Sequence, residues 1–497
     1  MRRDVVQKLG AGTLGAVASL GRVLPVTTES VSAHVPDVAS QNRARPNIIL
    51  ILLDDMRFDD LAAMPAVQSL LVDRGTSFTN FMVTTPSCAP ARASILRGQY
   101  LHNHGVMRSQ GEFGGFGRFH TLGHEKSTVA TWLQEAGYTT ALIGKYLDHY
   151  PYDEDFPASV TATYQPPGWS EWAGVTNEGY NSIVINENGE LNAYRGKRHY
   201  STDVFANKAV EFISQAVSTT WPFFLCLTPR APHGPAKPAA RHASAFARTS
   251  APRPPSFNEP DVSDKPAWVR ALPSLSDNDA AQIDDYYLDR LRTLLAVDEM
   301  VTTLIETLSK AGTLDSTFIL FTSDNGYHLG EHRASQEKGS PYEESILAPL
   351  VVRGPGVPEG KIAAALASQA DLAPTFAAWA GVEAPDFVDG RSLGPLLNGG
   401  PAPRTWRETV LVELFTDRPQ DSTGNTGFQA LRTEELIYVE YLTGERELYD
   451  LVQDPYQIDN LASEANPSLV RALSKRLARM TACTADSCRA IEAVPLP

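Results

Sequence analysis

Residues 47–55 read Asn-Ile-Ile-Leu-Ile-Leu-Leu-Asp-Asp, an unbroken run of large apolar residues that ends in two adjacent acids. A strand that is apolar on both faces is typical of the interior of a parallel sheet, which helices cover on each side. Open α/β sheets bind their ligands at the carboxyl ends of such strands. Residues 47–53 are therefore expected to form a central strand that presents Asp54 and Asp55 to a site.

Strand-like and helix-like segments alternate along the chain beyond this run. Ser127 and Asp203 are the expected N-caps of two helices, because a short polar side chain there satisfies the first free backbone N–H groups. The expected helices span 127–135, 203–213 and 286–308, and the expected strands span 139–143, 223–227 and 317–322. This alternation predicts an α/β fold with a large, mostly parallel sheet sandwiched by helices.

The pattern changes after about residue 385, where the strand-like runs become short. These runs span 409–414, 428–431, 436–441 and 448–451, and an amphipathic helix is expected over 468–480. We therefore predict a catalytic α/β domain over residues 41–385 and a smaller C-terminal α+β domain, with an antiparallel sheet, over residues 386–497.

Residues 1–40 have the features of an export signal and flexible leader. Arg2 and Arg3 precede a charge-free stretch at 9–20, and Val-Ser-Ala at 31–33 offers small residues for cleavage. The paired arginines favour the twin-arginine route to the periplasm or medium, and an ordinary flexible terminus is the alternative. No run of about 18 uncharged apolar residues occurs, so no transmembrane segment is expected.

The composition is that of a globular protein with an acidic surface. Of 497 residues, 42% are hydrophobic and 20% are charged, and the formal net charge is −15. A general nucleic-acid-binding protein is not expected, because phosphate binding needs an excess of Lys and Arg. An anionic small substrate requires only a local cluster of basic groups.

The four cysteines differ in their surroundings. Cys483 and Cys488 are close enough in sequence to close a small loop in an oxidising compartment. Cys226 lies in an apolar strand-like run and is expected to be buried. Cys88 follows a polar turn and precedes a helix-like segment, which places it, without a partner cysteine, near a helix N-terminus that favours a nucleophile.

Two pairs of oxygen donors follow two of the predicted strands. Asp54 and Asp55 end the first strand, and Asp324 and Asn325 follow the strand at 317–322. Oxygen-only sets suit Ca²⁺ or Mg²⁺ rather than zinc. Each pair alone is also compatible with a solvated turn, and the occurrence of both pairs together favours a metal site.

The segment Cys88-Ala-Pro-Ala-Arg92 resembles the signature of the formylglycine-dependent sulfatases, within the alkaline-phosphatase-like superfamily. Further segments resemble that family in the same order along residues 46–465. They are Asp54-Asp55, Gly144-Lys145, Ala231-Pro-His233-Gly-Pro235, Ser323-Asp-Asn-Gly326 with Lys338 beyond, and Glu447-Leu-Tyr-Asp-Leu451. The resemblance implies a sulfuric ester hydrolase with an alkaline-phosphatase-like fold.

The resemblance also implies how the reaction proceeds. A maturation enzyme oxidises Cys88 to formylglycine, whose hydrated aldehyde attacks sulfur through one hydroxyl and expels sulfate with the help of the other. One divalent ion, Ca²⁺ with Mg²⁺ as the alternative, is held by the residues Asp54, Asp55, Cys88, Asp324 and Asn325. In this scheme Arg92 stabilises the nucleophile and Lys145 and Lys338 neutralise the sulfate oxygens. His233 protonates the leaving alcohol.

The substrate is the less specific part of the resemblance. Gly144-Lys-Tyr-Leu147 and residues 254–259 look like N-acetylglucosamine-6-sulfatases and arylsulfatase-type relatives, which implies a sulfated sugar or glycosaminoglycan. Leu147 stands where many sulfatases carry a second histidine, and His149 is the candidate replacement. A rim of Arg248, Arg253 and Lys265 for a polyanion is a further hypothesis, and a solvated loop explains these residues equally well.

Three other functions compete with the sulfatase interpretation. A formylglycine-dependent phosphodiesterase or phosphonate monoester hydrolase uses the same kinds of residue, and an inactive carbohydrate-binding relative retains only the fold. A metal-dependent phosphatase with a Cys88 thiolate fits less well, because thiolates are rarely paired with a hard oxygen-only metal site.

Overall fold

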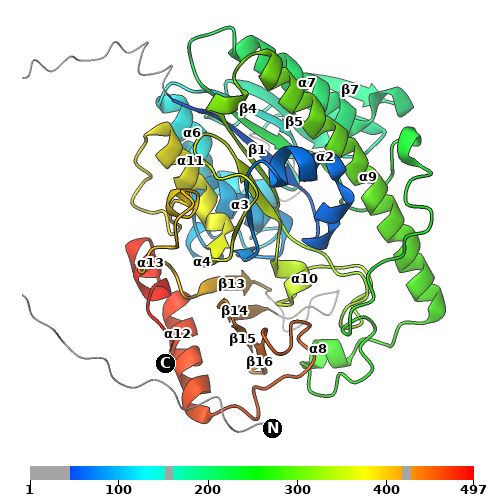
Figure 1. The fold of residues 1–497 in the computed structure, drawn as a ribbon, viewed down its shortest axis with the longest axis vertical. Helices are drawn as coiled ribbons and strands as arrows, with labels where there is room; N and C mark the ends of the chain where they lie inside the picture. Colours follow the sequence, from blue (N-terminus) through cyan, green and yellow to red (C-terminus); the bar gives the residue numbers. More distant parts are fainter. Residues whose placement is uncertain (1–44, 152–159, 417–426, 497) are drawn as a thin grey trace, which may run out of the picture. The chain divides into compact units, whose positions relative to one another are not determined.

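The computed structural model describes residues 45–151, 160–416 and 427–496, so the predicted leader lies outside the described residues. Its main element is a ten-stranded sheet (Figure 1). From edge to edge the strands are β11 (Lys361–Ala363), β2 (Thr76–Phe78), β10 (Leu350–Arg353), β9 (Thr317–Ser323), β1 (Asn47–Leu53), β8 (Phe223–Thr228), β4 (Thr139–Gly144), β5 (Glu171–Asn177), β6 (Ser182–Glu187) and β7 (Glu190–Arg195). The central strands β9, β1, β8, β4 and β5 are mutually parallel.

The central strand β1 is buried on both faces, as its sequence predicts. Ile48, Leu50 and Leu52 point into one apolar core, and the alternate residues of the strand point into the other. The first core is covered by α3 (Cys88–Arg97), α6 (Val129–Glu135) and α11 (Leu372–Ala380), and the second by α2 (Pro65–Val67), α7 (Ser201–Ala216) and α9 (Asp277–Lys310). The predicted α/β sandwich is therefore confirmed.

Both predicted N-caps are wrong. Helix α6 is capped by Thr128, which forms a reciprocal capping box with Thr131, while the Ser127 hydroxyl accepts a hydrogen bond from a tryptophan indole N–H. Asp203 lies within the first turn of α7 and its carboxylate pairs with Arg241. The side chains of Ser127 and Asp203 therefore bind a tryptophan and an arginine instead of the free backbone N–H groups at the helix starts.

The C-terminal part of the chain forms a separate, small antiparallel sheet. Its strands are β13 (Val410–Leu414), β14 (Phe428–Arg432), β15 (Leu436–Tyr441) and β16 (Arg446–Asp450). Helices α12 (Pro467–Met480) and α13 (Asp486–Glu492) pack on one face of this sheet. The predicted domain boundary at residue 385 stays a prediction. In the described residues no helix is both long and apolar enough to cross a membrane.

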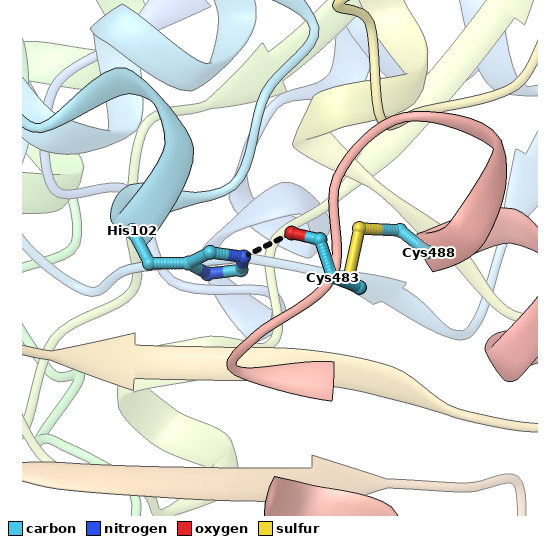
Figure 2. Close-up of side chains that lie close together, drawn as sticks. All are labelled: His102, Cys483 and Cys488. Carbon is cyan, nitrogen blue, oxygen red and sulfur yellow. Dashed lines mark hydrogen bonds between the residues drawn. A yellow bond between two sulfur atoms is a disulfide. The ribbon is translucent and has the colours of Figure 1, made fainter. Parts of the chain in front are cut away.

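A disulfide between Cys483 and Cys488 closes the loop that joins α12 and α13. Figure 2 shows the His102 ring directed at the backbone carbonyl of Cys483, with its Nε2 at 2.9 Å from that oxygen. The other ring nitrogen of His102 lies 2.7 Å from the carboxylate of Glu413 on β13. The closed loop therefore anchors the C-terminal helices to the segment that follows α3.

Removing this disulfide is expected to lower stability without removing the site. The C483A/C488A variant should lose about 2 kcal/mol of unfolding free energy, because a small closed loop restricts the unfolded chain by roughly that amount. The measurement is the midpoint of urea denaturation for the variant and for the reduced wild-type protein. A midpoint unchanged in both would contradict a stabilising role for the bridge.

Candidate active site

The four predicted oxygen donors meet beyond the carboxyl ends of β1 and β9. Asp55 has a φ of 67°, which turns the chain sharply after the strand, and its backbone N–H donates to Asp324 Oδ1 at 3.1 Å. The side-chain amide of Asn325 donates to Asp55 Oδ1 at 2.7 Å. All four donors, Asp54, Asp55, Asp324 and Asn325, are buried. The prediction that the two pairs lie together agrees with this arrangement.

Cys88 is the first residue of α3 and lies against these acids. Its Sγ is 3.4 Å from Asp54 Oδ1 and 3.9 Å from Asp55 Oδ1, and the residue is only 3% exposed. Ser87, in extended conformation, precedes the helix and directs Cys88 towards the strand ends. Residue 88 is thus held at a helix N-terminus, where the backbone dipole favours negative charge.

Three cations surround the carboxylates. Arg92, one helical turn after Cys88, donates through Nε to Asp324 Oδ2 at 2.8 Å. Lys145, which follows β4, places Nζ at 2.8 Å from Asp54 Oδ2. Lys338 pairs with Asp55 and places Nζ at 2.7 Å from Cys88 Sγ. The predicted basic residues therefore converge on one point despite their separation in sequence.

His233 lies at the open side of this cluster. It follows β8, its side chain is 29% exposed, and its Nε2 is 3.7 Å from Asp55 Oδ2. The other ring nitrogen, Nδ1, is 2.7 Å from the backbone carbonyl of Gly234. The guanidinium of Arg230, which can only donate, lies 3.1 Å from the same Nδ1. These two contacts fix the ring so that Nε2 faces the acids.

The charges of the cluster set the protonation of its members. Burial alone raises the pKa of Asp54, but the charges of Lys145, His233, Arg92 and Lys338 hold that pKa well below its ordinary value. Burial and the charge of Asp54 raise the pKa of Asp324 to about 6, although Arg92 opposes the shift. Burial also raises the pKa of the Cys88 thiol well above its ordinary value. An unmodified Cys88 is therefore a neutral thiol.

The donor set suits a hard divalent cation. Asp54, Asp55, Cys88 and His233 each place a ligand atom within 4.8 Å of the others. Among the described residues the buried Oδ1 of Asn325 has no hydrogen-bond partner, which is costly unless something else coordinates it. Carboxylate and amide oxygens are the ligands that Ca²⁺ and Mg²⁺ prefer. The residues present therefore fit a metal site.

A cleft of about 650 Å³ gives access to the cluster. Its walls include Asp55, Ser87, Arg108, His233, Lys338 and Phe415. Phe415 follows β13, so the small sheet contributes to the rim of the cleft as well as the main sheet. Lys145 and Arg92 are not part of these walls, and they are only 3% and 2% exposed.

Several residues that sequence reasoning missed support this cluster. Asp148 pairs with Lys145 Nζ at 2.9 Å, and Gln369 donates to the backbone carbonyl of Asp324 at 2.6 Å. Arg290 of α9 donates to the backbone carbonyl of Asp55. A charged residue within the apolar stripe of a long helix was the one available signal, since Arg290 is fully buried. Gln369 carried no signal in its local sequence.

The hypothesis of a basic rim is wrong for Lys265. This residue is 1% exposed and pairs with Glu259 at 3.0 Å. Glu259 also contacts the buried ring of His332, at 2.8 Å. Arg253 pairs with Asp284 at the surface. His149, the candidate replacement for the histidine missing at Leu147, is exposed in the turn after β4.

Comparison with known proteins agrees with this fold. The family model described as Sulfatase matches residues 46–382, and the model described as N-sulphoglucosamine sulphohydrolase, C-terminal, matches residues 330–483. Human N-acetylglucosamine-6-sulfatase is 31% identical over 481 residues, covering 90% of this chain and 86% of the relative.

Solved structures extend the comparison. A protein solved in complex with its substrate D-glucosamine-2-N,6-O-disulfate has a TM-score of 0.74 and 25% identity, covering 88% of this chain and 97% of that chain. A phosphonate monoester hydrolase from Silicibacter pomeroyi has a TM-score of 0.69 and 25% identity, covering 88% and 94%.

The fold is that of the alkaline-phosphatase-like class, with a large, mostly parallel sheet between layers of helices. Within that class the chain belongs to the sulfatase family and is a sulfuric ester hydrolase, as its sequence predicts.

Proposed function

We propose that this sulfatase hydrolyses sulfate monoesters of a sulfated sugar or glycosaminoglycan, such as N-acetylglucosamine 6-sulfate. The observation that carries the mechanism is the position of Cys88, 3.4 Å from Asp54 and 2.7 Å from Lys338, which lines the cleft. The choice of a sulfated sugar as substrate is supported by two similar proteins. One is the human relative named N-acetylglucosamine-6-sulfatase, and the other is the solved structure in complex with a glucosamine disulfate.

Residue 88 acts as the nucleophile after conversion to formylglycine. The raised pKa of the buried thiol argues against a thiolate nucleophile at neutral pH, so the unmodified side chain is poorly suited to attack sulfur. The hydrated aldehyde supplies two hydroxyls, of which one attacks sulfur and the other assists release of sulfate. The conversion requires a formylglycine-generating enzyme as a partner.

Arg92, Lys145 and Lys338 stabilise negative charge around residue 88. Lys338 is 22% exposed at the cleft wall, so it is placed to contact a sulfate oxygen directly. Lys145 and Arg92 approach from the buried side and are fixed by Asp148 and Asp324. Pre-positioned cations of this kind stabilise a transition state without reorganisation.

Asp54, Asp55, Asp324 and Asn325, with residue 88, would hold one divalent metal ion, Ca²⁺ or Mg²⁺. When bound, such an ion supplies Lewis-acid polarisation of a sulfate oxygen. The low pKa of Asp54 keeps that carboxylate ionised and ready to bind a cation. Lys338 pairs with Asp55 and Lys145 pairs with Asp54, which fixes the positions of these two carboxylates.

His233 protonates the departing alcohol. The H233Q variant should lower kcat about 100-fold or more on N-acetylglucosamine 6-sulfate, whose sugar alkoxide needs a proton. On 4-nitrophenyl sulfate the loss should stay below about ten-fold, because that leaving group needs little protonation. Steady-state kinetics on both esters measure the difference, and the H149Q variant serves as the exposed-histidine control. Equal losses on both esters would exclude the role of general acid.

A phosphodiesterase or phosphonate monoester hydrolase activity is the second candidate. The specific observation that favours it is the similarity to the phosphonate monoester hydrolase. Sulfate monoesters and phosphonate monoesters both present one net negative charge to Lys145 and Lys338, so these lysines do not separate them. Paired kcat/KM values on matched aryl esters decide between the two, and we expect the sulfate ester to be preferred.

We further propose that the protein is exported to the periplasm or medium, through the twin-arginine route. The supporting observations are Arg2 and Arg3 in the sequence and the disulfide between Cys483 and Cys488, which is typical of oxidising compartments.

A further inference from the structure

An exposed basic segment follows β7, at the same edge of the sheet as the candidate active site. Strand β7 pairs antiparallel with β6, and β6 pairs antiparallel with β5, so β7 runs in the direction of β5 and β1. Arg195, the last residue of β7, therefore lies at the edge where Asp54 and Lys145 leave their strands. We call residues 195–199, Arg-Gly-Lys-Arg-His, the basic segment.

The positive charges of the basic segment are exposed and uncompensated. Within the described residues, Arg195, Lys197 and Arg198 make no ion pair. Two neighbouring acids already have partners, since Glu178 pairs with Arg230 and Asp203 pairs with Arg241. In a chain of net charge −15, a local group of unpaired cations creates a surface of opposite potential that attracts anions.

Short contacts connect the basic segment to the His233 side of the cleft. The backbone N–H of Gly196 donates to the carbonyl of Asn181 at 2.8 Å. The neighbouring Tyr180 donates through its hydroxyl to the backbone carbonyl of His233, also at 2.8 Å. Residues 180–181 thus lie between the segment and the catalytic histidine loop, and the segment keeps a fixed position relative to that loop.

The spacing of the strands gives the length that a ligand needs in order to contact both the candidate active site and the basic segment. Five strand intervals separate β1 from β7, which amounts to about 24 Å at roughly 4.8 Å per interval. A monosaccharide whose sulfate lies against Cys88 does not span that distance, whereas a chain of several sugars does.

We propose that the basic segment binds anionic groups of a sulfated polysaccharide, several units from the ester that is cleaved. This inference rests on the proposed function.

The basic segment should affect binding and leave the chemical step unchanged. Its distance from the reacting atoms exceeds the Debye length of about 10 Å at 0.1 M salt, so its charges are largely screened from the transition state. Binding of a polyanion releases counterions and weakens as salt rises. The segment is therefore expected to lower KM for long substrates at low salt and to leave kcat unchanged.

The test compares R195Q/K197Q/R198Q with a charge-matched control, R471Q/K475Q/R479Q, which removes three exposed basic residues from α12. Substrates are 4-nitrophenyl sulfate, a sulfated monosaccharide and heparin octasaccharides, measured at 50 and 200 mM salt. Retention of each protein on immobilised heparin gives a second readout that needs no turnover.

We expect the segment variant to raise KM for the octasaccharide about ten-fold at 50 mM salt and to elute from heparin at lower salt. Its kinetics on the two small esters should match those of the wild type. A KM for the octasaccharide within two-fold of wild type, or an equal effect of the α12 control, would overturn the inference. If no ester is turned over, the proposed function fails, and the heparin retention of the two variants still decides whether the segment binds the polyanion.

Discussion

The C88A variant is expected to lose sulfatase activity by roughly 10⁴-fold or more, because removal of an enzymic nucleophile costs losses of this order or larger. Cys88 Sγ lies between Asp54 and Lys338, and among the described residues the one other free cysteine is Cys226. Within the part of the chain that the structure describes, no second free thiol lies beside Asp54 and Lys338. The measurement is kcat on 4-nitrophenyl sulfate with pure, folded variant protein.

The C226A variant is the matched control for this prediction. Cys226 is buried in β8, within the apolar core on the α3 side of the sheet, and contributes packing. Its loss should cost stability of about 1 kcal/mol and leave kcat within about two-fold of wild type. Full activity in C88A would contradict the assignment of the nucleophile, whereas equal losses in both variants would indicate a general effect of removing a buried thiol.

Removal of the metal ion is the second large effect that we expect. After treatment with a chelator and dialysis, kcat should fall about 1,000-fold or more, because a Lewis acid contributes several kcal/mol of transition-state stabilisation. Asp54, Asp55, Asp324 and Asn325 contribute oxygen donors only, so Ca²⁺ or Mg²⁺ should restore activity better than Zn²⁺. Metal content by elemental analysis must be followed together with the rate.

A binding readout separates the metal site from catalysis. Calcium added to the stripped protein should raise its melting temperature, since a ligand that binds only the folded state stabilises it. The N325A variant removes the unpartnered Oδ1 and should reduce this increase, whereas N398A, at an exposed asparagine, should not. A metal-free protein with full activity would contradict the proposed role of the ion.

The sequence predicts the centre of the fold well because its signals there are local. β1 spans Asn47–Leu53 as expected, since the six apolar residues in a row from Ile48 to Leu53 have few stable alternatives to a strand buried on both faces. The position of Asp54 and Asp55 follows from the end of that strand. The arrangement of Cys88 and Arg92 follows from one turn of helix, because residues four apart share a face.

The remaining features depend on contacts between distant segments, which one sequence does not reveal. Lys265 reads as an exposed residue of a polar loop, yet it is buried because Glu259 pairs with it and with His332. Gln369 donates to the backbone of Asp324 from 45 residues away. The cap at Ser127 fails because Thr128 satisfies the same backbone groups through its own capping box.

The most direct test of the central claim is the mass of the proteolytic peptide that contains Cys88, taken from protein made in its native host. We predict a peptide in which the thiol of residue 88 has been replaced by the aldehyde of formylglycine, and sulfatase activity that scales with the modified fraction. A fully active protein whose peptide carries only unmodified cysteine would contradict the account, because burial keeps that thiol neutral and leaves the site without the proposed nucleophile.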